Sequence, residues 1–134
     1  MAGYYIKLYV TVLSTFLLID GAWLGLIARG FYSKHLESLL KSNPNWGAAI
    51  LFYLLFVAGL LVFVIVPGVR RESVRSVLVH GAFFGLVAFA TYDLTNLALI
   101  RDWPLLVTVV DLIWGVTVGA AVSSVGFLAA RWFQ

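Results

Sequence analysis

The sequence predicts an all-α integral membrane protein: a bundle of four antiparallel helices, with a short amphipathic interfacial helix between the first two spans. Composition is the first observation, because 63% of residues are hydrophobic and only 11% charged, against about 45–50% and about 25% in globular domains. The mean hydropathy of +1.02 is the second. The third is that the apolar residues gather into four runs, each long enough to cross a hydrocarbon core of about 30 Å. We therefore expect residues 1–134 to form a single transmembrane domain.

Charge and cysteine usage narrow the function classes. The basic side chains mostly flank the apolar runs, which indicates topology anchors and lipid headgroup contacts rather than a nucleic-acid footprint. The absence of cysteine excludes disulfides, iron–sulfur clusters and thiol catalysis. No phosphate loop, nucleophile elbow or HExxH-type zinc motif is found.

The first span is expected over residues 5–28, a run longer than the 7–15 apolar residues typical of a signal peptide. In the segment that follows, Leu36, Leu39 and Leu40 share one helical face among charged residues, which predicts the interfacial helix. Asn43-Pro44-Asn45 is expected to end it. The second span is expected over 47–66, ending at Pro67-Gly68, and a basic connector leads to the third span.

The third span, expected over 77–100, carries Gly81 and Gly85 at a spacing that permits close approach of another helix. A turn at 101–104 leads to the fourth span, expected over 104–131, with Asp102 as its N-cap and Pro104 in its first turn. Gly115 and Gly119 form a second small-residue pair on that helix.

Three aspartates interrupt these apolar runs, and an ionisable residue at membrane depth is by default a functional-site hypothesis. Asp20 lies eight residues before Ala28, Asp93 eight before Arg101, and Asp111 seven after Pro104. At 1.5 Å per residue, each lies about 10–12 Å from the same membrane face, because neighbouring spans reverse direction. The three acids are therefore predicted to form one layer.

Neighbouring side chains complete the predicted site. Asp20 and Asp111 are each followed three residues later by tryptophan, which places acid and indole on one helical face and weakly suggests an inverted repeat. Asp93 is the candidate centre. The other candidate ligand-binding residues are Tyr53, at a similar depth, and Trp23, Tyr92, Thr95, Asn96, Arg101, Thr108 and Trp114.

Three carboxylates in one dry layer do not all stay ionised without cations. The sequence leaves four solutions open: protonation, a metal held by Asp20, Asp93 and Asp111, a proton-exchanging substrate, or arginines reaching in from the rim. A purely structural role, in which each aspartate accepts hydrogen bonds from a neighbouring helix, also stays open. No cofactor is indicated.

A set of motifs spans the chain: Asp20-x-x-Trp23-Leu-Gly25, Phe52-Tyr53, Tyr92-Asp93-Leu-Thr95-Asn96, Trp103-Pro104 and Asp111-Leu-Ile-Trp114-Gly115. On these motifs the sequence resembles a family of small bacterial membrane proteins known as domain of unknown function 2177. The resemblance implies a four-helix protein of the bacterial inner membrane. It carries no established activity.

Three functions fit these observations. The first is binding or proton-coupled transport of a cation, a polar small molecule or a lipid headgroup at the aspartates, for which four helices per chain favour a homodimer. The second is a membrane-embedded enzyme acting on a lipid or isoprenoid, which needs an apolar groove beside the acids. The third is an accessory subunit whose glycine stripes pack against a larger partner. The basic loop at 69–76 favours cytoplasmic termini, and the expected partner in every case is the lipid bilayer, with no nucleic acid.

Overall fold

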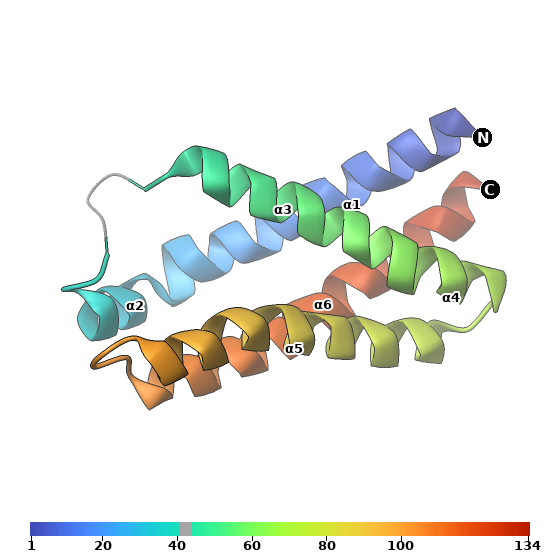
Figure 1. Ribbon diagram of the computed structural model, residues 1–134. Coiled ribbons are helices and arrows are strands. Elements are labelled where there is room, and N and C mark those ends of the chain that lie inside the picture. Colours follow the sequence, from blue (N-terminus) through green and yellow to red (C-terminus); the bar gives the residue numbers. More distant parts are fainter. Residues whose placement is uncertain (41–43) are drawn as a thin grey trace.

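The computed structural model describes residues 1–40 and 44–134, and this part of the chain is helical and contains no strand. Four continuous helical stretches are long and apolar enough to cross a membrane, which confirms the predicted fold class: Ala2–Ile27, Trp46–Arg70, Val74–Leu99 and Leu105–Phe133. They run antiparallel, so that α2 and the turn between α5 and α6 lie at one end of the bundle (Figure 1). The opposite end holds α4 and both termini. We call these the α2 end and the α4 end.

The first span consists of α1 (Ala2–Ala22) and a π-helical turn, η1 (Trp23–Ile27). The short helix α2 (Arg29–Leu36) follows and carries the expected interfacial segment. The predicted apolar face is wrong in detail, because the helix ends at Leu36. Leu36 is buried against the α5–α6 turn, whereas Leu39 and Leu40 lie beyond the helix and are exposed. Of the expected break at 43–45, residue 43 lies outside the described residues.

The second span joins α3 (Trp46–Leu60), the π-helical turn η2 (Leu61–Ile65) and α4 (Val66–Arg70). The predicted end at Pro67-Gly68 is wrong, since the helix continues through the proline to Arg70. Proline normally disrupts a helix because it has no N–H and its ring meets the carbonyl four residues earlier. Here the Val66 N–H already donates to the Leu61 carbonyl, five residues back, so the chain enters the proline from a widened turn.

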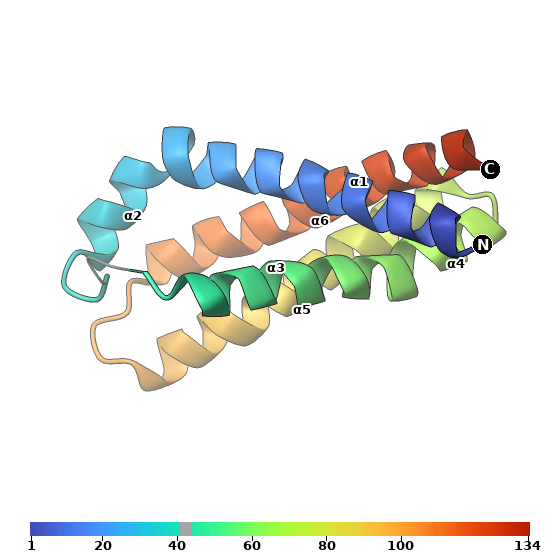
Figure 2. The same cartoon turned by 90° about the horizontal axis from the view of Figure 1, so that it is seen from above.

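The third and fourth spans, α5 (Val74–Leu99) and α6 (Leu105–Phe133), form the most extensive helix pair of the bundle. Their glycines face one another: a Cβ added at Gly81 would lie 2.7 Å from the Gly119 carbonyl oxygen, and one at Gly115 would lie 2.8 Å from the Gly85 carbonyl oxygen. The predicted close approach is therefore confirmed, and it occurs within the chain. α6 also packs along α1 (Figure 2).

Side-chain caps begin two of the spans, and a third begins differently from expectation. The Asn45 side chain accepts from the Ala48 N–H at the start of α3, and Ser73 accepts from the Ser76 N–H at the start of α5. Asp102 is not the N-cap of α6. It occupies the left-handed region, with φ 62°, rather than the extended conformation of an N-cap residue, and Pro104 takes the cap position without a side-chain bond.

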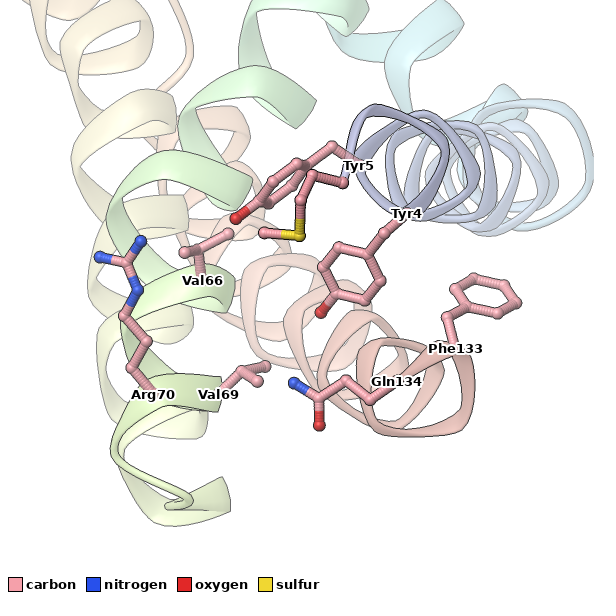
Figure 3. A pocket seen from close by; sticks show the side chains of 8 residues that line it. Tyr4, Tyr5, Val66, Val69, Arg70, Phe133 and Gln134 are labelled. Atoms are coloured by element: carbon pink, nitrogen blue, oxygen red, sulfur yellow. The ribbon is translucent and has the colours of Figure 1, made fainter.

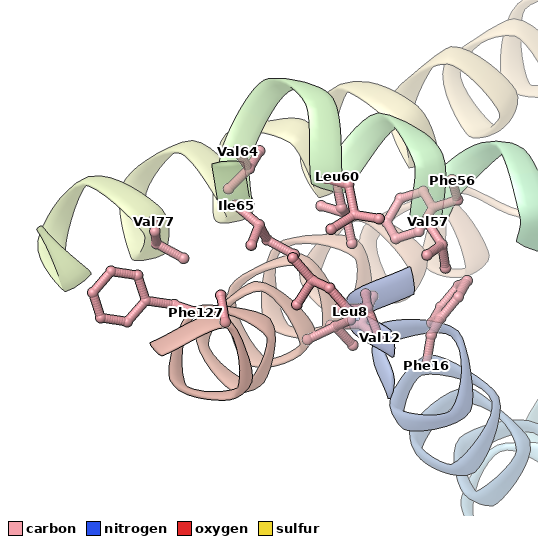
Figure 4. Close-up of a cluster of buried hydrophobic side chains, with 14 residues drawn as sticks. Leu8, Val12, Phe16, Phe56, Val57, Leu60, Val64, Ile65, Val77 and Phe127 are labelled. Atoms are coloured by element: carbon pink, nitrogen blue, oxygen red, sulfur yellow. The ribbon is translucent and has the colours of Figure 1, made fainter. Parts of the chain in front are cut away.

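The apolar core fills the half of the bundle nearer the α4 end (Figure 4). In this core, α1 contributes Leu8, Val12 and Phe16, α3 contributes Phe56, Val57 and Leu60, and η2 contributes Ile65. Gly126 of α6 gives room to this cluster, because a Cβ there would lie 2.5 Å from the Ile65 Cδ1. The polar side chains of the bundle interior are thereby concentrated towards the α2 end.

Candidate functional site: a layer of buried aspartates

Asp20 lies in the last turn of α1, and its carboxylate is fully engaged. The Tyr53 hydroxyl of α3 donates to Oδ2 at 2.9 Å, and the Trp114 indole N–H of α6 donates to Oδ1 at 3.0 Å. One buried carboxylate thus joins three spans. Each of its oxygens has a donor, as a buried carboxylate requires.

Asp111, in the second turn of α6, is held by the interfacial helix. The Tyr32 hydroxyl of α2 donates to its Oδ1, and the Trp23 indole N–H donates to the same hydroxyl oxygen at 3.2 Å. Burial, followed by the bond to Asp111, raises the pKa of Tyr32 above its usual range. Tyr32 therefore remains a protonated donor at neutral pH.

The two Asp-x-x-Trp motifs interlock across α1 and α6. The tryptophan of the second motif, Trp114, bonds the aspartate of the first, Asp20. The tryptophan of the first, Trp23, reaches the aspartate of the second, Asp111, through the Tyr32 hydroxyl. Their indole rings stack between these bonds, with centroids 4.4 Å apart and planes 8° apart. The repeated Asp-x-x-Trp spacing thus corresponds to reciprocal contacts between the first span and α6.

Asp93 differs from the other two acids because it is fully buried and neither of its carboxylate oxygens has a hydrogen-bond partner among the described residues. Asp111 is the neighbouring acid, because the Thr108 hydroxyl that reaches the Asp93 carbonyl oxygen lies one helical turn before Asp111 on α6. The nearest side-chain donor bonds the Asp93 carbonyl oxygen rather than its carboxyl group. The Trp103 indole N–H donates to the Thr108 hydroxyl at 3.0 Å, and that hydroxyl donates to the Asp93 carbonyl oxygen at 3.4 Å.

The predicted residues around Asp93 on α5 mostly point elsewhere. Tyr92 is 57% exposed and packs edge-on against Trp103. Thr95 and Arg101 are exposed, and Asn96 is half-buried. The buried residues of α5 are Val77, Gly81, Gly85 and Asp93, all on one row of four-residue steps. Helices that interdigitate along such rows bury a stripe that drifts around the helix, so Asp93 faces inwards and Tyr92 does not.

Sequence reasoning missed two residues of the layer. Tyr32 lies outside the spans, and no spacing rule connects it to an acid that is 79 residues away. Trp103 was noted within the Trp103-Pro104 motif, and its burial differs from that of Trp46 and Trp132. Those two are 67% and 85% exposed, whereas Trp103 is buried at 8%. Its nearness to Thr108, five residues on, was the one available signal.

The layer does not have the form of a three-acid metal site. In the part of the chain that the structure describes, no three His, Cys, Asp or Glu side chains gather closely enough to hold a metal ion. Asp20 has its own donors, Tyr53 and Trp114, whereas Asp111 accepts from Tyr32. The layer therefore has two parts: a satisfied carboxylate, Asp20, and a carboxyl pair, Asp93 and Asp111, with spare bonding capacity.

The fold and this layer define a class: a helical membrane protein with four candidate spans and with carboxylates buried between them. The chain belongs to the DUF2177 family, since the model of that family, described as a predicted membrane protein, matches residues 5–128. This confirms the resemblance drawn from the motifs. Comparison with curated proteins and with solved structures finds no match.

Proposed function

We propose that this protein binds a cation at the Asp93–Asp111 carboxyl pair in exchange for a proton. The observation that carries the proposal is the Asp93 carboxylate, which is fully buried and has no hydrogen-bond partner in the part of the chain that the structure describes. Polar groups that serve only the fold are normally paired. An unpaired carboxyl group near a second one is therefore a feature for which the packing of the bundle supplies no reason.

The exchange follows from elementary electrostatics. A lone carboxylate is too costly to keep ionised in apolar surroundings, so it holds either a proton or a cation. A second carboxyl group nearby increases the need for a proton or a cation, because each ionised group opposes ionisation of the other. A metal cation, an amine or the ammonium of a lipid headgroup could displace the proton, while Tyr32 holds the Asp111 carboxylate in place from α2.

Transport is the finer form of this proposal. Four spans per chain are few for a complete path across the bilayer, so coupled movement of proton and cation would need a homodimer. The basic loop between α4 and α5 supports a cytoplasmic location of the α4 end, in a bacterial inner membrane. In that orientation the carboxyl pair would open towards the outer face.

Proton release on cation binding tests the proposal. Sodium chloride, magnesium chloride or ethylammonium chloride is added to the purified protein in weakly buffered detergent solution, and a pH-indicator dye reports released protons. We expect release with at least one of the three salts, in proportion to protein concentration. Asp93→Asn should abolish it.

Asp102→Asn is the matched control. It makes the same chemical change at an exposed acid, and asparagine tolerates the left-handed backbone of that position. The control should release protons like the wild type. Absence of release with all three salts, or release that persists in Asp93→Asn, would contradict the proposal.

A structural role is the second candidate, and the observation favouring it concerns Asp20. That carboxylate accepts one bond from α3 and one from α6, and both of its oxygens are used. We therefore assign Asp20 to holding the spans together. The accessory-subunit version loses one of its supports, because the glycine stripes pack against each other within the chain.

The lipid-enzyme alternative needed an apolar groove beside the acids. Two apolar hollows are found, and both lie towards the α4 end, where no aspartate lines them. These two hollows therefore do not supply the groove that the enzyme alternative requires.

A further inference from the structure

An apolar groove runs along the surface between the first two spans towards the α4 end. Its walls are Tyr5 and Tyr9 of α1 and Ala58, Val62 and Val66 of the second span, and it has a volume of about 470 Å³. Arg70 lines the same groove and is the last residue of α4. Because these side chains follow one another along the second span, the groove is apolar over most of its length and positively charged at its end.

The groove has local structural causes. The Tyr9 hydroxyl donates to the Leu54 carbonyl oxygen at 2.8 Å, which fixes α1 to α3 at the inner end of the groove. Beyond this contact the two spans diverge towards the α4 end (Figure 1). Ala58 provides a small side chain between Leu54 and Val62, which lie four residues away on either side, and the π-helical turn η2 changes the rotation of the residues that follow it.

A second hollow adjoins the first at the charged end. Its volume is about 370 Å³, and it shares Tyr5, Val66 and Arg70 with the groove. Figure 3 shows these side chains around the hollow, with Gln134 at its edge. The Arg70 side chain therefore lies where two hollows meet.

The loop next to the groove carries a net positive charge. Arg70, Arg71 and Arg75 are opposed within this segment by one acid, Glu72. The Arg71 guanidinium donates to the Ser76 hydroxyl at 3.4 Å and thereby serves the start of α5. Arg70 is the arginine of this segment that lines the hollows.

We propose that this groove binds an anionic phospholipid, with an acyl chain between α1 and the second span and the phosphate on the Arg70 guanidinium. Charge complementarity selects this occupant, because the only charged side chain along the groove is a guanidinium at its end, and guanidinium pairs with phosphate through two parallel hydrogen bonds. The apolar walls match an acyl chain, and a basic cluster beside a span attracts anionic lipid. The site is separate from the carboxyl pair, which lies towards the α2 end.

Lipid binding to the delipidated protein in a neutral detergent tests this, with bound lipid counted by native mass spectrometry. Phosphatidylglycerol should bind more tightly than phosphatidylcholine, and inorganic phosphate should not displace it. Arg70→Gln should weaken phosphatidylglycerol binding by about fivefold, as expected for one basic side chain near a membrane surface. Arg70→Lys should retain most of it, which also guards against a fold defect in the glutamine variant.

Two further variants separate the parts of the site. Arg75→Gln removes the same charge from the same loop but outside the hollows, and should weaken binding less than Arg70→Gln does. Ala58→Phe fills the groove and should weaken binding of both lipids, with the helical circular dichroism preserved. Equal binding of the two lipids by the wild type, an equal loss in Arg75→Gln, or displacement by inorganic phosphate would each overturn the proposal.

Discussion

Replacing Asp20 and Asp93 by asparagine, one at a time, should change stability in opposite ways. Asp20 accepts two hydrogen bonds, from Tyr53 and Trp114. Asparagine offers one oxygen and one NH2 group, so one of the two buried donors would face another donor. Leaving one buried group unpaired costs about 1–3 kcal/mol. We therefore expect Asp20→Asn to lower the free energy of unfolding by this amount.

The same substitution at Asp93 removes a carboxylate whose oxygens have no hydrogen-bond partner within residues 1–40 and 44–134. No hydrogen bond is lost, the side-chain volume is conserved, and the opposition between the two neighbouring carboxyl groups disappears. The free energy of unfolding should be unchanged or higher. A residue whose replacement abolishes proton release but does not destabilise the fold is retained for function rather than for packing.

Unfolding by sodium dodecyl sulfate in mixed micelles, followed by circular dichroism, measures both variants against the wild type. The reasoning is refuted if Asp93→Asn loses as much stability as Asp20→Asn. That result would mean that Asp93 has a structural partner, and the layer would then be explained by packing alone.

Three other substitutions probe the bundle in the same assay. Gly85→Ala should destabilise by about 1–3 kcal/mol, because its methyl group overlaps backbone of α6, whereas Gly25→Ala, with nothing within 4 Å of the added Cβ, should be neutral or stabilising. Equal effects of the two would contradict the close approach of α5 and α6. Tyr32→Phe should destabilise by about 1–3 kcal/mol, since the Asp111 carboxylate loses its donor from α2, and an unaffected variant would remove α2 from the layer. Ser123→Ala should be neutral or stabilising, because the buried serine hydroxyl has no partner, and a loss above about 1 kcal/mol would reveal an undetected bond.

The spans and the depth of the polar layer could be predicted because both depend on distance along a helix. The rise of 1.5 Å per residue is nearly constant. Asp20 and Tyr53 were therefore expected at one level, and they meet in a hydrogen bond. The close approach of α5 and α6 could also be predicted, since glycines four residues apart are typical of close helix packing.

Rotation about the helix axis was harder to predict. The buried stripe of α5 advances in steps of four residues, so it passes through Asp93, whereas a stripe drawn from Gly81 at 100° per residue includes Tyr92. The passage through Pro67 was missed for a related reason. The π-helical turn before it depends on tertiary packing and leaves no signature in the local sequence.

The division of the layer between two halves of the bundle determines how it could open. Asp93 and Asp111 belong to α5 and α6, whose backbones approach each other closely at the glycines. Asp20 and Tyr53 belong to α1 and α3 and are hydrogen-bonded to each other. Trp23 of the first span stacks on Trp114 of α6, and Trp114 also bonds Asp20, so parting the first span from α6 at this level would break both contacts. The stacked indoles therefore hold the first span against α6, and their separation would change the tryptophan fluorescence of the protein.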